Sequence, residues 1–586
     1  MEHTIKSLIV GIDLGTTNSV VSYLADDKTP VTLDVDSAKL LPSVVSLTDS
    51  GFIVGQTAKN MLVLEPTKTI ASIKRKMGQD ITFTIGNHSM RPEEISGLIL
   101  KKIKQTVVQT FSLNENDVLR AVVTVPAYFT EEQRDATKQA AELAGLKVER
   151  IINEPTAAAL AFGLSQMDEA VYAIYDFGGG TFDVSVIESN EGLIEVLAST
   201  GNNSLGGDDL DSLLADFIWS AFLKSNKLSA DTPCSANEKA RLIRISERTK
   251  IQLSDTPSVN IQESFFANIK GINYHLEIPI NRADFESLIL SKVKETVEHL
   301  QKAVKEAGIT FDNLNGIILV GGSSRIPMIA QMIEEQLNVV PILIDLPDEA
   351  VAHGAAIQGA IIDGVDIDTI LVDITPHSLG IAVSDRNERM EDMMSMLRGG
   401  GNLDKSLRAA AIISKNTPIP TKRSDRFFSS TPFQEKYHLK IFQGENPYFD
   451  DNKKIGETYL EVENPVEDGV VDVTFALDIN GLLNVTAMEA TTGESVQVVF
   501  KSSRGKKIRE DKLKDLHIVS DVTESDHTLL RRAENLLSSK QLNEEDKAEL
   551  DELSNRFRTA LSENTPSVSS IETELLDLLY YLENNA

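Results

Sequence analysis

The sequence predicts a multidomain protein in which a large α/β domain is followed by an all-β domain and a short helical segment. Three observations predict this order. Strand-like runs alternate with helical patterns over residues 1–365, which is typical of α/β architecture. Apolar and polar residues alternate between turn signals over 375–503, which indicates β-strands. From 504 to 586 apolar residues recur at helical spacing.

The α/β prediction depends on particular segments of the first 365 residues. Strand candidates lie at 8–12, 121–125, 172–175 and 316–320. A helix is expected over 130–144, because this segment opens with Thr-Glu-Glu-Gln and is followed by Gly145. Residues of these types mark the start and the end of a helix.

An internal repeat indicates that the α/β domain has two lobes. The segments around Asp13 and Asp176 each contain an apolar strand, an aspartate, a turn rich in Gly and Thr, and a second strand. Such a turn suits polyphosphate, because glycine lets backbone N–H groups approach phosphate oxygens, and aspartate can hold Mg²⁺ with its waters. We therefore expect two loops that face each other across a nucleotide. The sequence lacks the Gly-x-x-x-x-Gly-Lys-Ser/Thr pattern of a P-loop enzyme.

Two further patterns are weak on their own. At 317–327 a strand ends in paired glycines, where the backbone can approach a base or a ribose, but a strand followed by two glycines is common. Glu247, Lys250 and Ser254 share one face of an expected helix. Their spacing alone favours a solvated polar face.

The remaining domains are predicted from a linker, a hairpin and a helical repeat. In the linker, residues 366–374, acidic residues flank the apolar run Ile370-Leu371-Val372. In the β-domain, Asn480-Gly481 is a tight-turn signal between two runs of alternating apolar residues. The tail repeats apolar residues at helical spacing, at Leu550, Leu553, Phe557 and Leu561.

The composition excludes some classes of function. The formal net charge of −31 argues against nucleic acid or an anionic membrane as the main partner, because phosphate surfaces attract Lys and Arg. The single cysteine, Cys234, cannot form an intramolecular disulfide. The N-terminal apolar run is too short for a signal peptide, and no apolar stretch reaches the ~20 residues of a membrane helix. We therefore expect a cytoplasmic protein.

Together these segments resemble the seventy-kilodalton heat-shock protein family, the DnaK-type chaperones, over essentially the whole chain. The matching blocks are GIDLGTTNS (11–19), VTVPAYF (123–129), RIINEPTAAA (150–159), DFGGGTFD (176–183), LGGDD (205–209), GGSSRIP (321–327), DEAVAHGAA (348–356), DITPHSLG (373–380), KNTPIP (415–420) and QGE (443–445). The short tail and segments 442–446 and 478–485 are most similar to the specialised HscC-type members.

The resemblance implies an actin/hexokinase-like nucleotide-binding domain, a β-sandwich peptide-binding domain and a short α-helical lid. It implies that Asp13, Glu154 and Asp176 organise Mg²⁺ through water, and that Lys74 orients the attacking water. It implies that Thr181 and the two loops hold the phosphates of ATP or ADP, and that a third group holds the adenosine. The implied nucleotide contacts are Gly15, Thr16, Thr17, Asn18, Gly178, Gly179, Gly180, Gly206, Gly207, Glu247, Lys250, Ser254, Gly321, Gly322, Ser323, Arg325 and Asp348.

The resemblance also implies that ATP hydrolysis controls the grip on unfolded client polypeptides, assisted by a J-domain co-chaperone and a nucleotide-exchange factor. The implied relay comprises Pro126, Arg134, Arg150, Ile370, Leu371, Val372 and Asp373. The implied peptide contacts are Ile381, Phe427, Phe428, Ser429 and Tyr437. Ser384, Thr431 and Tyr437 depart from the general chaperone pattern, and a methionine-rich insertion occupies 386–408. These departures favour a narrow client range.

Two other functions stay open at this point. A sugar kinase of the same superfamily would share the phosphate loops, but it would need a sugar cleft and a catalytic base, and it would not need the linker or the β-domain. An exchange partner or a holdase independent of hydrolysis would not need the complete set of Asp13, Lys74, Glu154, Asp176 and Thr181.

Overall fold

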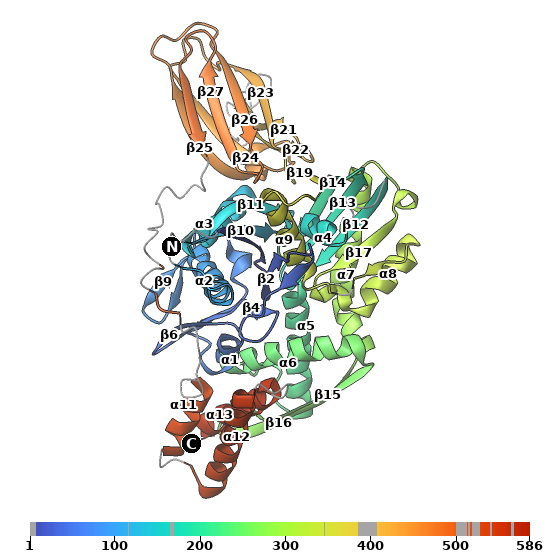
Figure 1. Cartoon of the computed structure of the whole chain (residues 1–586), viewed down its shortest axis with the longest axis vertical. Helices are drawn as coiled ribbons and strands as arrows, with labels where there is room; N and C mark the ends of the chain where they lie inside the picture. Colours follow the sequence, from blue (N-terminus) through green and yellow to red (C-terminus); the bar gives the residue numbers. More distant parts are fainter. Residues whose placement is uncertain are drawn as a thin grey trace, which may run out of the picture.

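A computed structural model describes residues 7–114, 117–163, 169–344, 346–367, 369–384, 407–499, 513, 516–518, 528–538, 542–563 and 568–585. The molecule is elongated (Figure 1). A two-lobed α/β domain occupies its middle, a β-sandwich lies at one end, and three C-terminal helices lie at the other. No helix in the described ranges is long and apolar enough to cross a membrane.

The first lobe is built on a six-stranded sheet. In order across the sheet its strands are β11 (Lys147–Asn153), β10 (Val118–Val125), β1 (Ser7–Asp13), β2 (Asn18–Leu24) and β3 (Pro30–Thr32), with β4 (Leu41–Pro42) beside β2. β1 runs parallel to β10 and antiparallel to β2. Helices α2 (Pro92–Thr110) and α3 (Glu131–Leu143) pack together, and apolar residues of α2 share a buried core with the sheet.

Smaller elements extend the first lobe toward the C-terminal helices (Figure 1). They are the sheet of β5 (Val45–Thr48), β6 (Gly51–Val54) and β7 (Thr69–Ile70), helix α1 (Gln56–Leu64), the short 3₁₀ turn η1 (Ile73–Lys76) and the hairpin of β8 (Phe83–Ile85) and β9 (His88–Met90).

The second lobe repeats the plan of the first. Its sheet has the order β18 (Ile342–Leu343), β17 (Gly316–Val320), β12 (Ala170–Phe177), β13 (Phe182–Asn190), β14 (Leu193–Asn202), β19 (Ile370–Ile374) and β22 (Pro418–Ile419). β12 is antiparallel to β13 and parallel to β17, just as β1 is antiparallel to β2 and parallel to β10. The two hairpins predicted from the internal repeat are therefore present.

Further elements complete the second lobe and join it to the first. They are α5 (Gly207–Ser225), α6 (Ala236–Asp255), α7 (Arg282–Glu306), α8 (Pro327–Leu337), the hairpin of β15 (Ser258–Ile269) and β16 (Ile272–Asn281), and the turns η3 (Phe311–Asn313) and η4 (Gly322–Arg325). Two helices, α4 (Glu154–Ala161) and α9 (Ala350–Ile362), pack against each other and contact strands of both lobes.

The β-domain is a sandwich of two four-stranded antiparallel sheets. One has the order β21 (Leu407–Ile413), β20 (Leu379–Ser384), β24 (Lys436–Gln443) and β25 (Lys453–Glu461), and the other β23 (Thr421–Phe428), β26 (Val470–Leu477), β27 (Leu483–Glu489) and β28 (Ser495–Val499), with η6 (Phe449–Asp451) between β24 and β25. The alternating residues of β26 and β27 are buried, and Gly481 adopts a φ of 76° in the turn between them. The predicted hairpin is confirmed.

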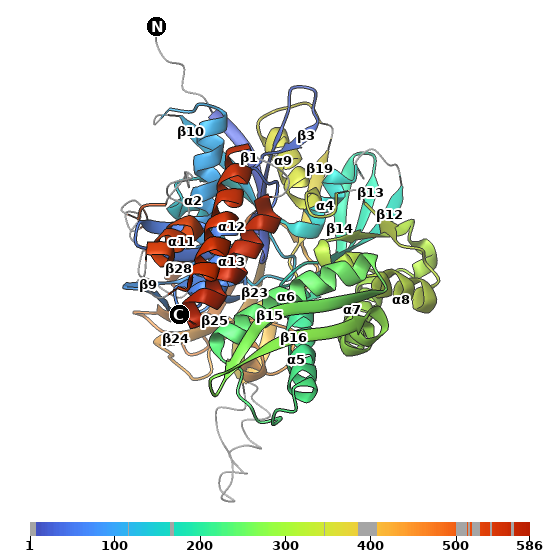
Figure 2. The same ribbon diagram turned by 90° about the horizontal axis from the view of Figure 1, so that it is seen from below.

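The C-terminal helices are α11 (Thr528–Ser538), α12 (Glu544–Glu563) and α13 (Val568–Asn585). The helical character predicted for the tail is confirmed, and Leu550 and Phe557 are buried in its core. The position of these helices differs from that of a lid, which would cover the sandwich. In this structure the helices pack on the α/β domain, beside α1 and α6, at the end opposite the sandwich (Figures 1 and 2).

Candidate nucleotide-binding site

A cavity of about 420 Å³ opens between the two lobes, a size that suits a small ligand. Both repeated loops reach it, as the internal repeat predicts. The predicted residues that line it are Asp13, Gly15, Thr16, Thr17, Asn18, Lys74, Glu154, Asp176, Gly178, Gly179, Thr181, Glu247, Lys250, Gly321, Gly322, Ser323, Arg325 and Asp348. Ser254 lines an adjoining cavity that shares Lys250, Gly322 and Arg325.

The two loops touch each other at their glycines. A Cβ atom on Gly179 would lie 1.9 Å from Thr17 Oγ1, and one on Gly180 would lie 2.3 Å from Thr16 Cγ2. No side chain larger than hydrogen fits at either position. Glycine therefore lets the two loops lie directly against each other. Gly178 and Gly179 line the cavity, where backbone N–H groups can cradle phosphate.

Gly180, Gly206 and Gly207 do not line the cavity but lie behind the loop that does. Gly207 N donates to Gly178 O at 3.0 Å, and Asp208 N donates to Gly179 O at 2.7 Å. The segment 206–208 therefore holds the loop in place, and its effect on a ligand is indirect.

A cluster of charges forms the floor of the cavity. Lys74, on η1, is 3% exposed and is paired with the Glu154 carboxylate at the start of α4. Burial opposes the charged form of Lys74, but Glu154, Asp13 and Asp176 outweigh it and raise its pKa. Thr124 Oγ1 donates to Asp13 Oδ1 at 2.8 Å. The lysine thus stays an ammonium beside three carboxylates.

The carboxylates at the floor of the cavity have raised pKa values. Burial raises the pKa of Glu154 to about 7, although Lys74 lowers it. Burial and the neighbouring Glu154 raise the pKa of Asp176 well above its ordinary value. Buried carboxylates that repel one another favour a bound cation. In the described part of the chain these carboxylates do not form a group that could hold a metal ion directly, so they would hold Mg²⁺ through its waters.

Several lining residues were not predicted from the sequence. Asp208 follows Gly207 and accepts from Ser72 Oγ at 2.5 Å, and Asp211 is paired with Lys250 at 2.8 Å. Ile251 lies next to Lys250 and keeps 57% of its surface exposed although it is apolar, and it lines both cavities. An exposed isoleucine in a cleft wall gives a flat apolar surface for a base. The helical pattern of α6 did not distinguish it from a surface residue.

Arg325 and Asp348 lie on the same side of the cleft as Ile251. The Arg325 guanidinium donates to Asp348 Oδ2 at 2.9 Å, and Ser323 Oγ donates to Gly178 O at 2.9 Å. The weak strand–Gly–Gly pattern at 317–327 is thereby tied to the second phosphate loop. The spacing of Glu247, Lys250 and Ser254 favoured a solvated polar face on α6. In the structure this face lines the two cavities instead.

A family model described as Hsp70 protein matches residues 9–398 and 400–583. The chain belongs to the Hsp70 family. It is a chaperone of the Hsp70 type, and the ATPase activity general to the family applies to it. Members of the family bind ATP and ADP, client polypeptides and co-chaperones. The fold class predicted from the sequence, an actin/hexokinase-like α/β domain with a β-sandwich and a helical segment, is confirmed.

The linker forms a strand shared by two domains. In β19, Ile370, Leu371 and Val372 run parallel to β14 of the second lobe, in register with 193–195. Asp373 and Ile374 then pair with β22, next to the sandwich. One sheet therefore continues from the α/β domain into the β-domain.

The remaining predicted relay residues surround this strand. Asn153 Nδ2 donates to Asp373 Oδ1 at 2.6 Å, and the Arg134 guanidinium donates to the same asparagine side chain. Arg134 and Asp373 are each 5% exposed. Arg150 is buried nearby and lies within the field of Asp373, and Pro126 is buried at the end of β10. The structure brings all the predicted relay residues to one junction.

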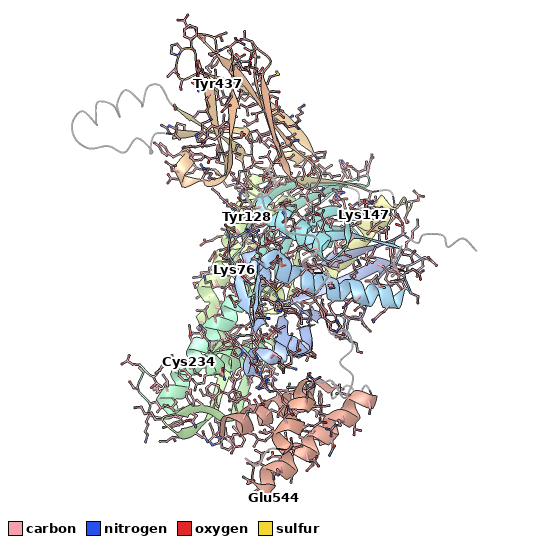
Figure 3. The ribbon with its side chains drawn as sticks, turned by 90° about the vertical axis from the view of Figure 1, so that its left-hand side faces the viewer. Lys76, Tyr128, Lys147, Cys234, Tyr437 and Glu544 are labelled. Carbon is pink, nitrogen blue, oxygen red and sulfur yellow. The ribbon has the colours of Figure 1, made fainter. Side chains whose placement is uncertain are left out.

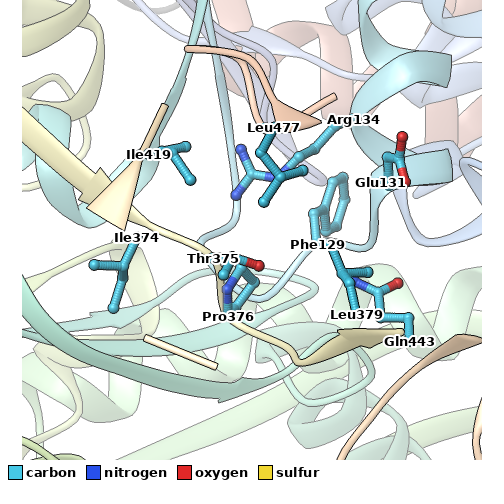
Figure 4. A pocket seen from close by; sticks show the side chains of 11 residues that line it. Phe129, Glu131, Arg134, Ile374, Thr375, Pro376, Leu379, Ile419, Gln443 and Leu477 are labelled. Atoms are coloured by element: carbon cyan, nitrogen blue, oxygen red, sulfur yellow. The ribbon is translucent and has the colours of Figure 1, made fainter. Parts of the chain in front are cut away.

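A small cavity of about 20 Å³ lies at this junction (Figure 4). Arg134, Phe129 and Glu131 reach it from the first lobe, while Ile419 and Leu477 reach it from the sandwich. Leu483 N donates to the Glu131 carboxylate at 2.5 Å. Burial raises the pKa of Glu131 to about 8.

The predicted peptide contacts are dispersed by comparison. Ile381 and Tyr437 are 3% and 9% exposed and belong to the core of the sandwich, whereas Phe428 is 70% exposed. Ser429 N donates to Gly469 O at 2.8 Å, Phe427 is partly buried, and Tyr437 lies in the half of the sandwich away from the α/β domain (Figure 3). Most of the methionine-rich insertion, 386–406, lies outside the described residues.

Proposed function

We propose that this chain is an ATP-driven chaperone in which a Mg²⁺-dependent ATPase cleft controls the grip of the β-sandwich on extended apolar peptides. The proposal assigns the ATPase domain to 1–365, the linker to 366–374, the peptide-binding domain to 375–503 and the helical segment to 504–586. It includes a J-domain co-chaperone and a nucleotide-exchange factor as partners in the cytoplasm, with no role for nucleic acid or a membrane.

The shared sheet carries this proposal. β19 pairs with β14 on one side and with β22 on the other. A movement of the second lobe therefore shifts β19, and with it β22 and the sandwich. A ligand of the cleft shifts such an equilibrium by its different affinity for the docked and undocked states. The buried charges of Arg134 and Asp373 make that difference large, since neither is stable when it is buried alone.

The cleft residues have complementary roles in this proposal. When bound, the nucleotide would supply the phosphoryl group, and its Mg²⁺ would supply the positive charge that offsets the carboxylates. The backbone of Gly178 and Gly179 and the Thr16, Thr17 and Thr181 hydroxyls bind and orient the phosphates. Lys74, held by Glu154, keeps its proton and stabilises negative charge as it develops, which is the main form of catalysis in phosphoryl transfer.

A narrow client range is the finer part of the proposal. Tyr437 places its hydroxyl where a Cβ atom on Gly469 would be 2.1 Å away, beside Ser429. A large side chain at this position leaves less room for an apolar peptide side chain. This arrangement supports an HscC-like specialist more than a general chaperone.

The test is to measure ATP hydrolysis and peptide release together with the full-length protein. We expect apolar peptide to raise ATP turnover and ATP to accelerate peptide release, while Thr181→Ala abolishes the effect of ATP. Phosphorylation of a sugar, or peptide release that is the same with and without ATP, would contradict the proposal.

A further inference from the structure

The C-terminal helices contact both lobes of the nucleotide cleft. On the first lobe, Ala58 and Met61 of α1 share one buried core with Leu530 and Leu579. The ion pair between Arg532 and Glu65, 3.1 Å long, joins α11 to the end of α1. These contacts are mostly apolar, and Figure 1 shows the C-terminal helices next to α1 and α6.

On the second lobe, α13 contacts α6 and β15. Asp577 is paired with Arg244 of α6. The Tyr580 ring covers the guanidinium of Arg241 at 4.5 Å, and Tyr581 stacks on Phe265 of β15 with ring centroids 3.9 Å apart. This half of the contact is smaller and more polar than the half on the first lobe.

The chain leading to these helices is itself held on the first lobe. Leu513 and Ile518 are 1% exposed and belong to the core of that lobe, and Phe52 N donates to His517 O at 3.0 Å. The first lobe has glycines where this chain crosses it. A Cβ atom on Gly51 would lie 2.7 Å from His517 O, and one on Gly97 would lie 2.7 Å from Leu513 Cδ1. The docked path is therefore built into the first lobe.

The position of the helices matters because α6 is one wall of the cleft. Its residues Glu247 and Lys250 line the cavity, and the opposite wall belongs to the first lobe. Lys59 of α1 already bridges the two walls through Glu247 at 2.7 Å. A movement of α6 away from α1 would widen the cleft, and it would break the contacts of α13 with α6 and β15.

We infer that the C-terminal helices are a latch that holds the nucleotide cleft closed and slows nucleotide release. The latch stays anchored on the first lobe through Leu513, Ile518 and α11. It opens on the second lobe at Arg244, Arg241 and Phe265. The same segment therefore regulates the residence time of the nucleotide from the end of the molecule opposite the peptide site. This inference rests on the proposed binding of nucleotide in the cleft.

The test is the release rate of a fluorescent ADP from the full-length protein, measured by stopped flow. Asp577→Arg is expected to accelerate release at least fivefold, because it places two cations together. The double variant Arg244→Asp with Asp577→Arg is expected to restore the rate to within twofold. Asp551→Arg, the same change at an exposed position of α12, is the matched control and leaves the rate unchanged.

A second variant guards against an effect on folding. Tyr581→Ala removes the ring stacked on Phe265 without adding charge, and we expect a threefold or larger acceleration. Rates that are unchanged in both Asp577→Arg and Tyr581→Ala, or raised equally in Asp551→Arg, would overturn the latch. A wild-type protein that binds no ADP would instead overturn the proposed function, so the two failures are distinguishable.

Discussion

The nucleotide cleft and the peptide positions of the sandwich are built in opposite ways. In the cleft, Lys74, Glu154 and Asp176 are ionisable and at least 93% buried, and Lys74 is paired with Glu154. In the sandwich, Ile381 and Tyr437 belong to an apolar core and Phe428 faces solvent. A buried charge tolerates few substitutions because its partners must stay in place. An apolar contact tolerates many substitutions, so the peptide-binding residues of the sandwich can vary with the clients.

The largest expected effect is at the buried lysine of the cleft. Lys74→Ala removes the cation among Asp13, Glu154 and Asp176, and we expect ATP turnover to fall by about 10²–10³. Lys76→Ala is the matched control, since Lys76 lies in the same short turn and is exposed. Steady-state phosphate release measures both variants. Equal turnover in the two would mean that the buried cluster has no catalytic role.

A substitution at the junction between the α/β domain and the sandwich should have nearly as large an effect. Arg134→Ala removes the hydrogen bond to Asn153 and one of the two cations, Arg134 and Arg150, that offset the buried Asp373, and we expect docking of the sandwich to weaken by about 1–3 kcal/mol. Stimulation of ATP turnover by peptide should then disappear, while basal turnover persists. Glu142→Ala, at an exposed position of the same helix α3, should keep full stimulation. Interdomain fluorescence energy transfer reports the docking directly, and unchanged transfer in Arg134→Ala would contradict the relay.

The same junction predicts a dependence on pH. In the docked state the pKa of Glu131 is raised from 4.5 to about 8. Burial is the main cause, the N–H of Leu483 opposes it, and the nearby Asp135, Glu132 and Asp478 add to it. Docking therefore takes up a proton between these two values. It is strongest below pH 4.5 and weakens as the pH rises toward 8.

Energy transfer between the domains, measured from pH 6 to 8.5, tests this dependence. We expect the transfer to fall with rising pH in the wild type and to be nearly flat in Glu131→Gln, which carries no titrating proton. The same slope in both proteins would assign the pH dependence to another group.

The smallest expected effect is in the sandwich. Tyr437→Val enlarges the space beside Ser429 and Gly469, and we expect tighter binding of peptides with bulky aliphatic residues by roughly tenfold or less. Tyr459→Val is the control, because Tyr459 is 45% exposed on a neighbouring strand of the same sheet. Peptide arrays probed with both variants measure the range. An unchanged set of bound peptides would show that Tyr437 does not limit the site.

Only some residues of the nucleotide cleft could be predicted from the sequence without the family resemblance. The phosphate loops were predicted because Gly and Thr beside Asp13 and Asp176 have a chemical meaning that is independent of the fold. Lys74 and Glu247 came only from the family resemblance, because a lysine in a basic run and a glutamate on a helix face are ordinary surface residues. Ile251 was missed for the same reason.

The position of the C-terminal helices was also not predictable. An amphipathic pattern such as that of Leu550 and Phe557 requires that an apolar face be covered, but it does not say by what. The deciding contact joins Arg244 to Asp577, 333 positions apart in the chain. Nothing in the local sequence around either residue marks the pair.

The most direct test of the account is the release of a labelled apolar peptide from the full-length protein after rapid mixing with ATP and Mg²⁺. The proposed coupling predicts that ATP accelerates release at least tenfold in the wild type and has no effect in Arg134→Ala, although that variant still hydrolyses ATP. Release that ATP leaves unchanged in the wild type, or accelerates equally in Arg134→Ala, would contradict it.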